Sequence, residues 1–478
     1  MRQLSGLDAL FLNVEMPGQP MQIITLGLLR ARTGGPLTLE DLHRHLTARL
    51  DQLPVLRCRV VPVPLGLANP VLVDDPQFDL LQHLHRVILP RPGGQAELDV
   101  ACAQLVSQCL DRGRPLWRIT LIDGLADGRQ ALVLEFHHAL MDGLATRNTL
   151  ARIFSDEAPD SPAPWQPGPM PGHARLVTGA LAHNAQALAR LPGLFGRTRR
   201  ATVAVRQRLA GAAVKVPAAG VDVPPSAINS GSTVQRRFAQ ASLPLDDVLA
   251  VKDFAGVTVN DVALALVGGA LRGFLGARRA LPDRPLVASV PVGMGESGCT
   301  PRAEGNRVVS LHTSLATDVA DPWERLARIS AVTTEAKRCL DLQGRELVAD
   351  WLECIPPVLA AALARRSEAA RRRPGKRPVK LDANVVVSNV RVDPQSPGSS
   401  DPPSWRRYTW RRPAAGPAST SCSGTTQTVC YSESYRSLSQ SMTPVSWPCI
   451  CPVPSKNSSR PPSSAESRRP DAHASFSR

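Results

Sequence analysis

A change in composition at about residue 393 limits how much of this chain can fold around a core. Residues 393–478 hold 21 serines and 13 prolines in 86 positions, and they show no helical or alternating apolar pattern longer than a turn. Such a segment buries too little apolar surface to offset the conformational entropy that is lost on ordering. We therefore predict a disordered tail at 393–478.

Strand and helix patterns alternate through the preceding residues, on both sides of a proline-rich segment. The sequence predicts an N-terminal α/β half-domain at 1–155, a proline-rich linker and basic helical crossover at 156–232, and a second α/β half-domain at 233–392. Strands are expected at 20–29, 55–60, 71–73, 117–122, 131–136, 236–243, 286–292, 306–315 and 384–390. Helices are expected at 38–50, 95–109, 174–191, 245–254, 260–271 and 322–340.

The chain has a formal net charge of +15, and its arginines cluster in two runs, at 190–208 and 365–377. Only 4% of the residues are aromatic, too few for the stacking platforms of a single-stranded nucleic-acid binder, so we expect no nucleic-acid partner. The runs suit an anionic lipid surface, a phosphorylated cofactor or a solvated charged face. The helix expected at 174–191 is basic and partly apolar, which fits a membrane interface or packing between the half-domains.

The ten cysteines show neither paired C-x-x-C units nor the dense, regular spacing of a disulfide scaffold. We therefore expect free thiols in a reducing compartment and no bound metal. No stretch reaches the roughly 18 uninterrupted apolar residues of a membrane-spanning helix. The N-terminus also lacks the long apolar region of a signal peptide, so a cytoplasmic location is expected.

The apolar run Ala131–Leu134 leads almost directly into the sequence His-His-x-x-x-Asp-Gly at 137–143. Histidine can take a proton from an alcohol near neutral pH and return it to a leaving group. Adjacent histidines on an extended backbone point to opposite faces, so only one can face a given substrate channel. Asp142 can accept hydrogen bonds or pair with an arginine, while Gly143 permits a positive φ or a close backbone approach. The spacing predicts one base and one structural brace.

Motifs elsewhere in the chain occur in an order that is specific to one family. These are 4–12 (LSGLDALFL), 115–117 (PLW), 258–262 (TVNDV) and 384–390 (NVVVSNV). Together with the histidine motif they resemble the bacterial wax ester synthase/diacylglycerol acyltransferase family, within the coenzyme-A-dependent acyltransferase and condensation-domain superfamily. The resemblance runs from about residue 3 to about residue 392.

The resemblance implies an α/β fold of two chloramphenicol-acetyltransferase-like half-domains with mixed sheets and an active site at their interface. It implies transfer of a fatty acyl group from acyl-coenzyme A to a diacylglycerol or a long-chain alcohol, with acyl-coenzyme A as co-substrate and no permanently bound cofactor. Peripheral contact with the inner membrane or with lipid droplets is expected as well.

By the same resemblance, His138 is the base toward the hydroxyl and then the acid toward the thiolate. His137 either orients His138 or fills the other face of the strand, and Asp142 is the brace. Asn260 is a candidate donor to the developing oxyanion, although an Asn-Asp pair before an apolar helix is also an ordinary N-cap signal. The expected substrate contacts are Asn306, Ser388 and Asn389.

The sequence departs from the family pattern at several points. Gln22 stands where a histidine commonly follows Pro-Met, Arg118 replaces an acidic residue after Pro-Leu-Trp, and Asn229 begins only a loose match to an Asn-Gly turn. The resemblance also stops where the composition changes. We interpret the tail as the product of a reading-frame shift near residue 393; a genuine basic disordered tail is the alternative, and the nucleotide sequence distinguishes the two.

Two other functions stay open from the sequence. One is a condensation-type acyltransferase that acts on a carrier-bound substrate, which would share the histidine motif. The other is a non-catalytic lipid-binding relative that was inactivated by its altered C-terminus.

Overall fold

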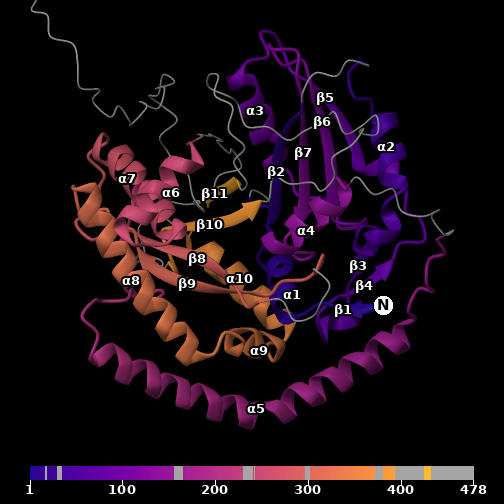
Figure 1. The fold of residues 1–478 in the computed structure, drawn as a ribbon. Helices are drawn as coiled ribbons and strands as arrows, with labels where there is room; N and C mark the ends of the chain where they lie inside the picture. Colours follow the sequence, from indigo (N-terminus) through magenta and orange to yellow (C-terminus); the bar gives the residue numbers. More distant parts are fainter. Residues whose placement is uncertain are drawn as a thin grey trace, which may run out of the picture. The chain divides into compact units, whose positions relative to one another are not determined.

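The computed structural model describes residues 1–16, 19–29, 35–155, 165–229, 241, 243–295, 302–371, 381–392 and 425–431 (Figure 1). All of these belong to one compact unit, Met1–Arg436. The strand predicted at 236–243 falls almost entirely outside the described residues, as does most of the predicted disordered tail.

The N-terminal part of the chain is built on a mixed sheet with the strand order β2-β7-β6-β5. Strand β7 (Gln130–His137) pairs antiparallel with β2 (Gln22–Leu29) and with β6 (Trp117–Asp123), while β6 runs parallel to β5 (Leu84–Ile88). A smaller antiparallel sheet joins β1 (Arg2–Gln3), β4 (Val71–Asp74) and β3 (Cys58–Val61). The helices of this part are α1 (Gly6–Val14), α2 (Leu39–Thr47), α3 (Gln95–Val106) and α4 (Gly143–Ile153).

The second part contains another mixed sheet, with the order β11-β10-β8-β9. Strand β10 runs parallel to β8, whereas the β8/β9 and β10/β11 pairs are antiparallel. The strands are β8 (Val287–Gly293), β9 (Val308–Ser314), β10 (Val385–Val392) and β11 (Thr425–Tyr431). The helices are α5 (His173–Ala210), α6 (Leu245–Ala255), α7 (Val259–Gly276), α8 (Pro322–Gln343), α9 (Leu347–Glu353) and α10 (Pro357–Arg371).

Strand β7 is buried along its whole length, which explains its unbroken apolar sequence. Leu132, Leu134 and Phe136 contribute to one apolar cluster, with α1 and α2, and Ala131 and Val133 contribute to another, with α3. Because successive residues of a strand point to opposite faces, a strand that is covered on both faces needs apolar residues at both sets of positions. The strand therefore delivers its last residue, His137, into a site with 0% exposure.

The mixed α/β architecture predicted from the sequence is confirmed, but several element boundaries differ. The segment 55–60 was expected to be one strand, whereas Pro54–Arg57 forms a 3₁₀ turn and the strand begins at Cys58. Proline lacks the N–H that a strand ladder needs, and its fixed φ suits the first position of a helical turn. Helix α5 continues through Pro192 to Ala210, well past the expected end at residue 191.

Two further predictions need correction or qualification. Residues 425–431 of the predicted disordered tail form strand β11, which pairs with β10 from Val386 to Val392. Among the described helices, α7 alone is long and apolar enough to cross a membrane by length and composition, with 33% of its residues buried in the protein. Core helices of soluble proteins meet the same criterion, and Leu264 and Leu275 of α7 belong to the core around β8 and β9.

Candidate active site

Strand β7 ends at the histidine pair, where the backbone turns sharply toward α4. The N–H of His137 donates to the carbonyl oxygen of Leu116 at 2.9 Å, and the N–H of His138 donates to that of Met21 at 2.8 Å. The N–H of Leu140 then donates back to the carbonyl oxygen of His137 at 2.9 Å. Both histidines are thus fixed through their backbones to neighbouring segments.

His137 is completely buried, and its surroundings determine which ring nitrogen carries the proton. Its Nδ1 accepts a hydrogen bond of 2.9 Å from the N–H of Ala139, so a neutral ring is protonated at Nε2. That nitrogen lies 3.2 Å from Oε1 of Glu15. Burial would raise the pKa of Glu15, but His137 and Arg112 outweigh burial and lower that pKa to about 2. Both ring nitrogens of His137 therefore face groups of the protein.

His138 has a different environment. Its ring stacks on Phe11 with centroids 4.5 Å apart and an angle of 14° between the planes. Nδ1 is buried without a hydrogen bond among the described residues, although the residue as a whole is partly exposed. Burial and the nearby His137 lower the pKa of His138 to about 4, despite the opposing effects of Asp142 and Asn306. At neutral pH the ring is uncharged, as a general base requires.

Asp142 joins the histidine turn to a segment more than 150 residues away. Its Oδ1 caps α4 by accepting the N–H of Ala145 at 2.9 Å, and its Oδ2 accepts Nη2 of Arg302 at 2.7 Å and the N–H of Arg307 at 2.9 Å. The backbones also meet, because the N–H of Gly305 donates to Leu140 at 2.6 Å. Arg302 is thus the arginine partner that the motif left unidentified.

Gly143 is the first residue of α4, and its φ is not positive, so the turn does not use the left-handed conformation that the sequence allowed. The requirement for positive φ falls instead on Gly305, at +72°. The residue of this site that needs a left-handed backbone therefore lies on the segment that binds Asp142.

Asn306, which the sequence predicts to be a substrate contact, is hydrogen-bonded to Asp8 and to the backbone of His138. Its side chain is 8% exposed, and its Nδ2 donates to Oδ1 of Asp8 at 2.7 Å and to the carbonyl oxygen of His138 at 2.6 Å. Both amide hydrogens are therefore used within the protein, since they have these two acceptors.

The remaining predicted residues lie on elements near the site, without a hydrogen bond to either histidine among the described residues. Asn260 is the second residue of α7, and the N-cap of that helix is Thr258, whose side chain accepts the N–H of Asp261 at 3.2 Å. Asn260 is partly exposed and does not cap the helix. Ser388 and Asn389 lie on β10, a strand that contacts α4.

Arg118 and Gln22, which depart from the family pattern, lie on strands of the N-terminal sheet, and the side chain of each is hydrogen-bonded. Arg118 faces Glu135 across β6 and β7, with hydrogen bonds of 2.6 and 2.9 Å to the buried carboxylate. Gln22 lies opposite His137 and donates to the carbonyl oxygen of Gln108 at 2.6 Å. The charge of Arg118 thus compensates that of the buried Glu135 carboxylate.

Sequence reasoning missed that α1 supplies three of the site's contacts. Asp8, Phe11 and Glu15 contact Asn306, His138 and His137 respectively. Their spacing of three and four residues places them along one side of a helix and its C-cap. The spacing of Asp8 and Phe11 was visible within the LSGLDALFL motif, and Glu15 follows it by three residues, but nothing local identified the partners.

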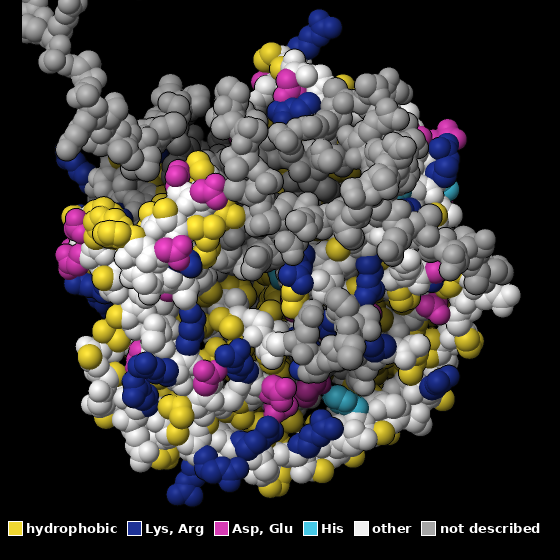
Figure 2. Space-filling view, in the orientation of Figure 1, with side chains coloured by type: hydrophobic (Ala, Val, Ile, Leu, Met, Phe, Trp, Pro, Cys, Tyr) yellow, Lys and Arg dark blue, Asp and Glu magenta, His cyan; other side chains and the backbone are white. Residues whose placement is uncertain are grey.

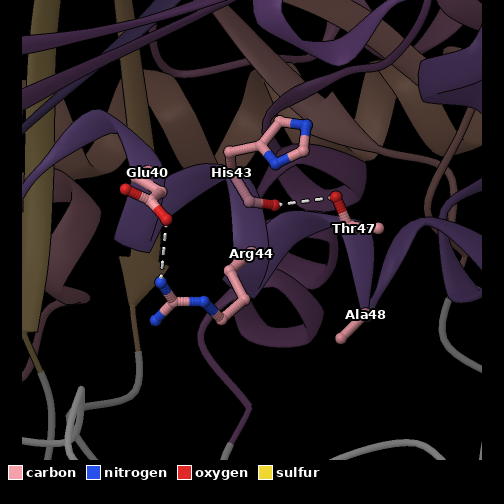
Figure 3. Close-up of a pocket in the computed structure, with 5 residues that line it drawn as sticks. All are labelled: Glu40, His43, Arg44, Thr47 and Ala48. Atoms are coloured by element: carbon pink, nitrogen blue, oxygen red, sulfur yellow. Dashed lines mark hydrogen bonds and ion pairs between the residues drawn. The ribbon is translucent and has the colours of Figure 1, made fainter.

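Two surface hollows lie apart from these residues. One, of about 380 Å³, is lined by α2, and its polar groups already pair with one another: Arg44 with Glu40 at 3.4 Å and Thr47 with the carbonyl of His43 at 2.8 Å (Figure 3). The other, of about 590 Å³, lies between the end of α5 and α8. No group of His, Cys, Asp and Glu side chains within the described ranges is arranged to hold a metal ion.

Comparison with known proteins agrees with the motif order. The model of the wax ester synthase/diacylglycerol acyltransferase catalytic domain matches residues 4–263, and that of the C-terminal domain of the same family matches residues 304–400. The chain belongs to this family. Membership makes it an acyltransferase.

Two mycobacterial relatives support the assignment. A protein of Mycobacterium tuberculosis H37Rv named as a diacylglycerol O-acyltransferase is 34% identical over 430 residues, which cover 86% of each chain. A second protein of that strain with the same name is 36% identical over 357 residues, covering 74% of this chain and 70% of its own. Among solved structures, the wax ester synthase/diacylglycerol acyltransferase of Marinobacter aquaeolei VT8 is 27% identical, with a TM-score of 0.49 over 81% of this chain and 89% of its own.

Proposed function

We propose that this acyltransferase moves a fatty acyl group from acyl-coenzyme A to the hydroxyl of a diacylglycerol or a long-chain alcohol. The observation that carries the proposal is the state of His138. Its ring stacks on Phe11 just after a buried strand, and the residue is partly exposed, whereas His137 is 0% exposed. The names of the family and of the mycobacterial relatives supply the substrate class.

In the proposed reaction, Nε2 of His138 takes the proton from the alcohol as its oxygen attacks the thioester carbonyl. The C–O bond forms, and the C=O electron pair moves to the oxygen of the tetrahedral intermediate. When that pair returns, the C–S bond breaks and the protonated His138 gives its proton to the departing sulfur. The two half-steps restore neutral His138, so no covalent enzyme intermediate is needed. Asn260 stays our proposed donor to the oxyanion.

Replacing His138 by alanine tests the proposal. Purified protein is incubated with labelled acyl-coenzyme A and with either diacylglycerol or hexadecanol, and the labelled ester is measured. We expect ester from the wild type and a loss of about 10²- to 10⁴-fold in rate for His138→Ala, the usual contribution of a general base. The control is His85→Ala, which removes an exposed histidine of β5.

Two outcomes contradict the proposal. Equal rates for wild type and His138→Ala would show that His138 is not the base. Absence of ester from the wild type with both acceptors would favour a non-catalytic lipid-binding protein.

We also propose that α5 contacts an anionic lipid surface. Leu181, Leu188 and Phe195 are 58%, 65% and 59% exposed, and their spacing of about two turns places them along one side of the helix. Arg199 and Arg206 continue this side toward the C-terminal end, and both are exposed. Figure 2 shows Lys and Arg side chains along the lower rim, where α5 runs in Figure 1. An apolar stripe beside arginines matches the charge and polarity of a membrane interface.

A further inference from the structure

Helix α1 and Asn306 form a connected layer beneath His138. Asp8 at the start of the helix accepts both the backbone N–H of Asn306, at 2.8 Å, and its Nδ2, at 2.7 Å. Phe11, one turn later, stacks on the imidazole ring. Asp8 is 1% exposed and Asn306 is 8% exposed, so this layer has no direct access to substrate.

The orientation of the Asn306 amide follows from its partners. Nδ2 faces two acceptors, the Asp8 carboxylate and the carbonyl oxygen of His138. A flipped amide would place Oδ1 against both of these oxygens, which is unfavourable, so the orientation is determined by the hydrogen-bond network. Oδ1 of Asn306 therefore points away from the Asp8 carboxylate and from the carbonyl oxygen of His138.

One buried atom of each residue then lacks a hydrogen-bond partner among the described residues. Oδ1 of Asn306 is an acceptor without a donor there, and Nδ1 of His138 is likewise unpaired. The Asn306 side chain interacts with the imidazole strongly enough to raise the pKa of His138, against the larger effect of burial. A buried donor that meets a buried acceptor satisfies it, whereas a buried polar group that is left unpaired destabilises the protein.

We propose that Asp8 and Asn306 are positioning residues that hold the proton of neutral His138 on Nδ1, through an Nδ1–H hydrogen bond to Oδ1 of Asn306, so that Nε2 presents its lone pair to the alcohol. This inference rests on the proposed role of His138 as the base. Phe11 fixes the plane of the ring, and Asp8 fixes the amide. When His138 takes the alcohol proton, the same Asn306 oxygen stabilises the imidazolium at Nδ1.

The tautomer can be observed directly in the wild-type protein. Long-range ¹H–¹⁵N spectra of protein labelled at histidine distinguish a protonated from an unprotonated ring nitrogen, and the spectrum of His138→Ala assigns the His138 signals. At pH 7 we expect Nδ1 protonated and Nε2 unprotonated. A His138 ring protonated at Nε2 overturns the inference.

A reciprocal exchange of the two polar side chains tests the network through activity. Asn306→Asp alone places a carboxylate oxygen against Asp8 and should lower kcat by about 10²-fold, in the range of a lost positioning group. Adding Asp8→Asn restores a donor opposite an acceptor at this contact, while the new carboxylate faces Nδ1 and the hydrogen bond to the His138 carbonyl stays lost. The double variant should recover part of kcat, and the acid limb of kcat/KM should move upward by about one pH unit, because a carboxylate favours the imidazolium.

A purely structural role predicts a different result. Recovery of the melting temperature without any shift of the acid limb would contradict the proposal. Asn184→Leu serves as the matched control, since Asn184 also donates to a backbone carbonyl, that of Leu67, at 2.8 Å. His138→Ala distinguishes a failure of the proposed function from a failure of this inference. An active His138→Ala variant would refute His138 as the base. If that variant is inactive but His138 of the wild type is protonated at Nε2, only the positioning role is refuted.

Discussion

At the level of single residues, the two adjacent histidines differ in how far the protein surrounds their rings. His137 uses Nδ1 to accept from Ala139 and turns Nε2 toward Glu15, so neither nitrogen is available. His138 is partly exposed, and its Nδ1 has no hydrogen bond among the described residues. The structure thus distinguishes two side chains that the sequence treats alike, and it favours His138 as the proposed base.

The pH dependence of the rate should reflect the depressed pKa of His138. A general base works in its neutral form, so activity is retained above the pKa and is lost as pH falls through it. With the pKa lowered to about 4, kcat/KM should stay level from neutral pH to about pH 5 and decline below. Initial rates between pH 4 and 8, each corrected for loss of folded protein by circular dichroism, measure this. An acid limb centred near the ordinary histidine value would disagree.

At the level of elements, Asp142 connects the turn after β7 to the segment that precedes β9. Asp142→Asn keeps an N-cap for α4, because asparagine caps as well as aspartate, but it removes the charge that faces Arg302. The carboxylate of Asp142 is 2% exposed and the side chain of Arg302 is 21% exposed. We expect the free energy of unfolding in urea to fall by about 3 kcal/mol, the lower part of the range for breaking a buried pair.

A helix cap without an arginine partner provides the control for this substitution. Asp321 caps α8 by accepting the N–H of Glu324 at 2.8 Å, and it is exposed. Asp321→Asn should change the free energy of unfolding by less than about 0.5 kcal/mol. Similar losses for both variants would mean that the ion pair with Arg302 contributes little.

Helix α1 is fixed against α9 by a close approach of the two backbones. A Cβ at Gly6 would overlap the backbone of Leu352, and the N–H of Gly6 donates to Oε1 of Glu353 at 2.7 Å. Gly6→Ala should therefore displace α1, and with it Phe11 and Asp8.

The expected effect of Gly6→Ala is a loss of about 1–3 kcal/mol in stability, as for overpacking, together with a decrease in kcat that exceeds any change in KM. Thermal unfolding and steady-state kinetics measure the two effects. The control is Gly179→Ala on the open side of α5, where a Cβ meets nothing within 4 Å. If Gly6→Ala lowers stability but leaves kcat at the wild-type value, the position of α1 does not affect the reaction.

At the level of the whole molecule, α5 should dominate binding to lipid vesicles. Co-sedimentation with anionic liposomes should decrease as salt is added, because salt screens charges at the surface within about 10 Å at 0.1 M. Leu181→Ser/Leu188→Ser should weaken binding further. Phe254→Ser on α6 is the control, since it removes another exposed apolar side chain, 83% exposed, outside α5. Equal losses from both would indicate nonspecific adhesion.

Much of the secondary structure could be predicted because each element has a local signal. The capping boxes that begin α2 and α7, at Thr38 and Thr258, and the proline at the start of α8 are all visible in the sequence. The length of α5 was not predictable, because a proline inside a helix usually ends it and only packing against α8 and α9 explains its continuation. The C-terminal family match ends at residue 400, near the change in composition.

For the site, the sequence by itself predicted a base and a brace on one turn after a buried strand, because strand period and residue spacing are local properties. Only the tertiary structure decided that His138 is the partly exposed member of the pair and that Arg302 is the partner of Asp142. It also decided that Asp8, Phe11 and Glu15 lie around the histidines. These contacts join residues more than 100 positions apart. Such pairs form only when separately specified elements pack together, so local pattern cannot identify them.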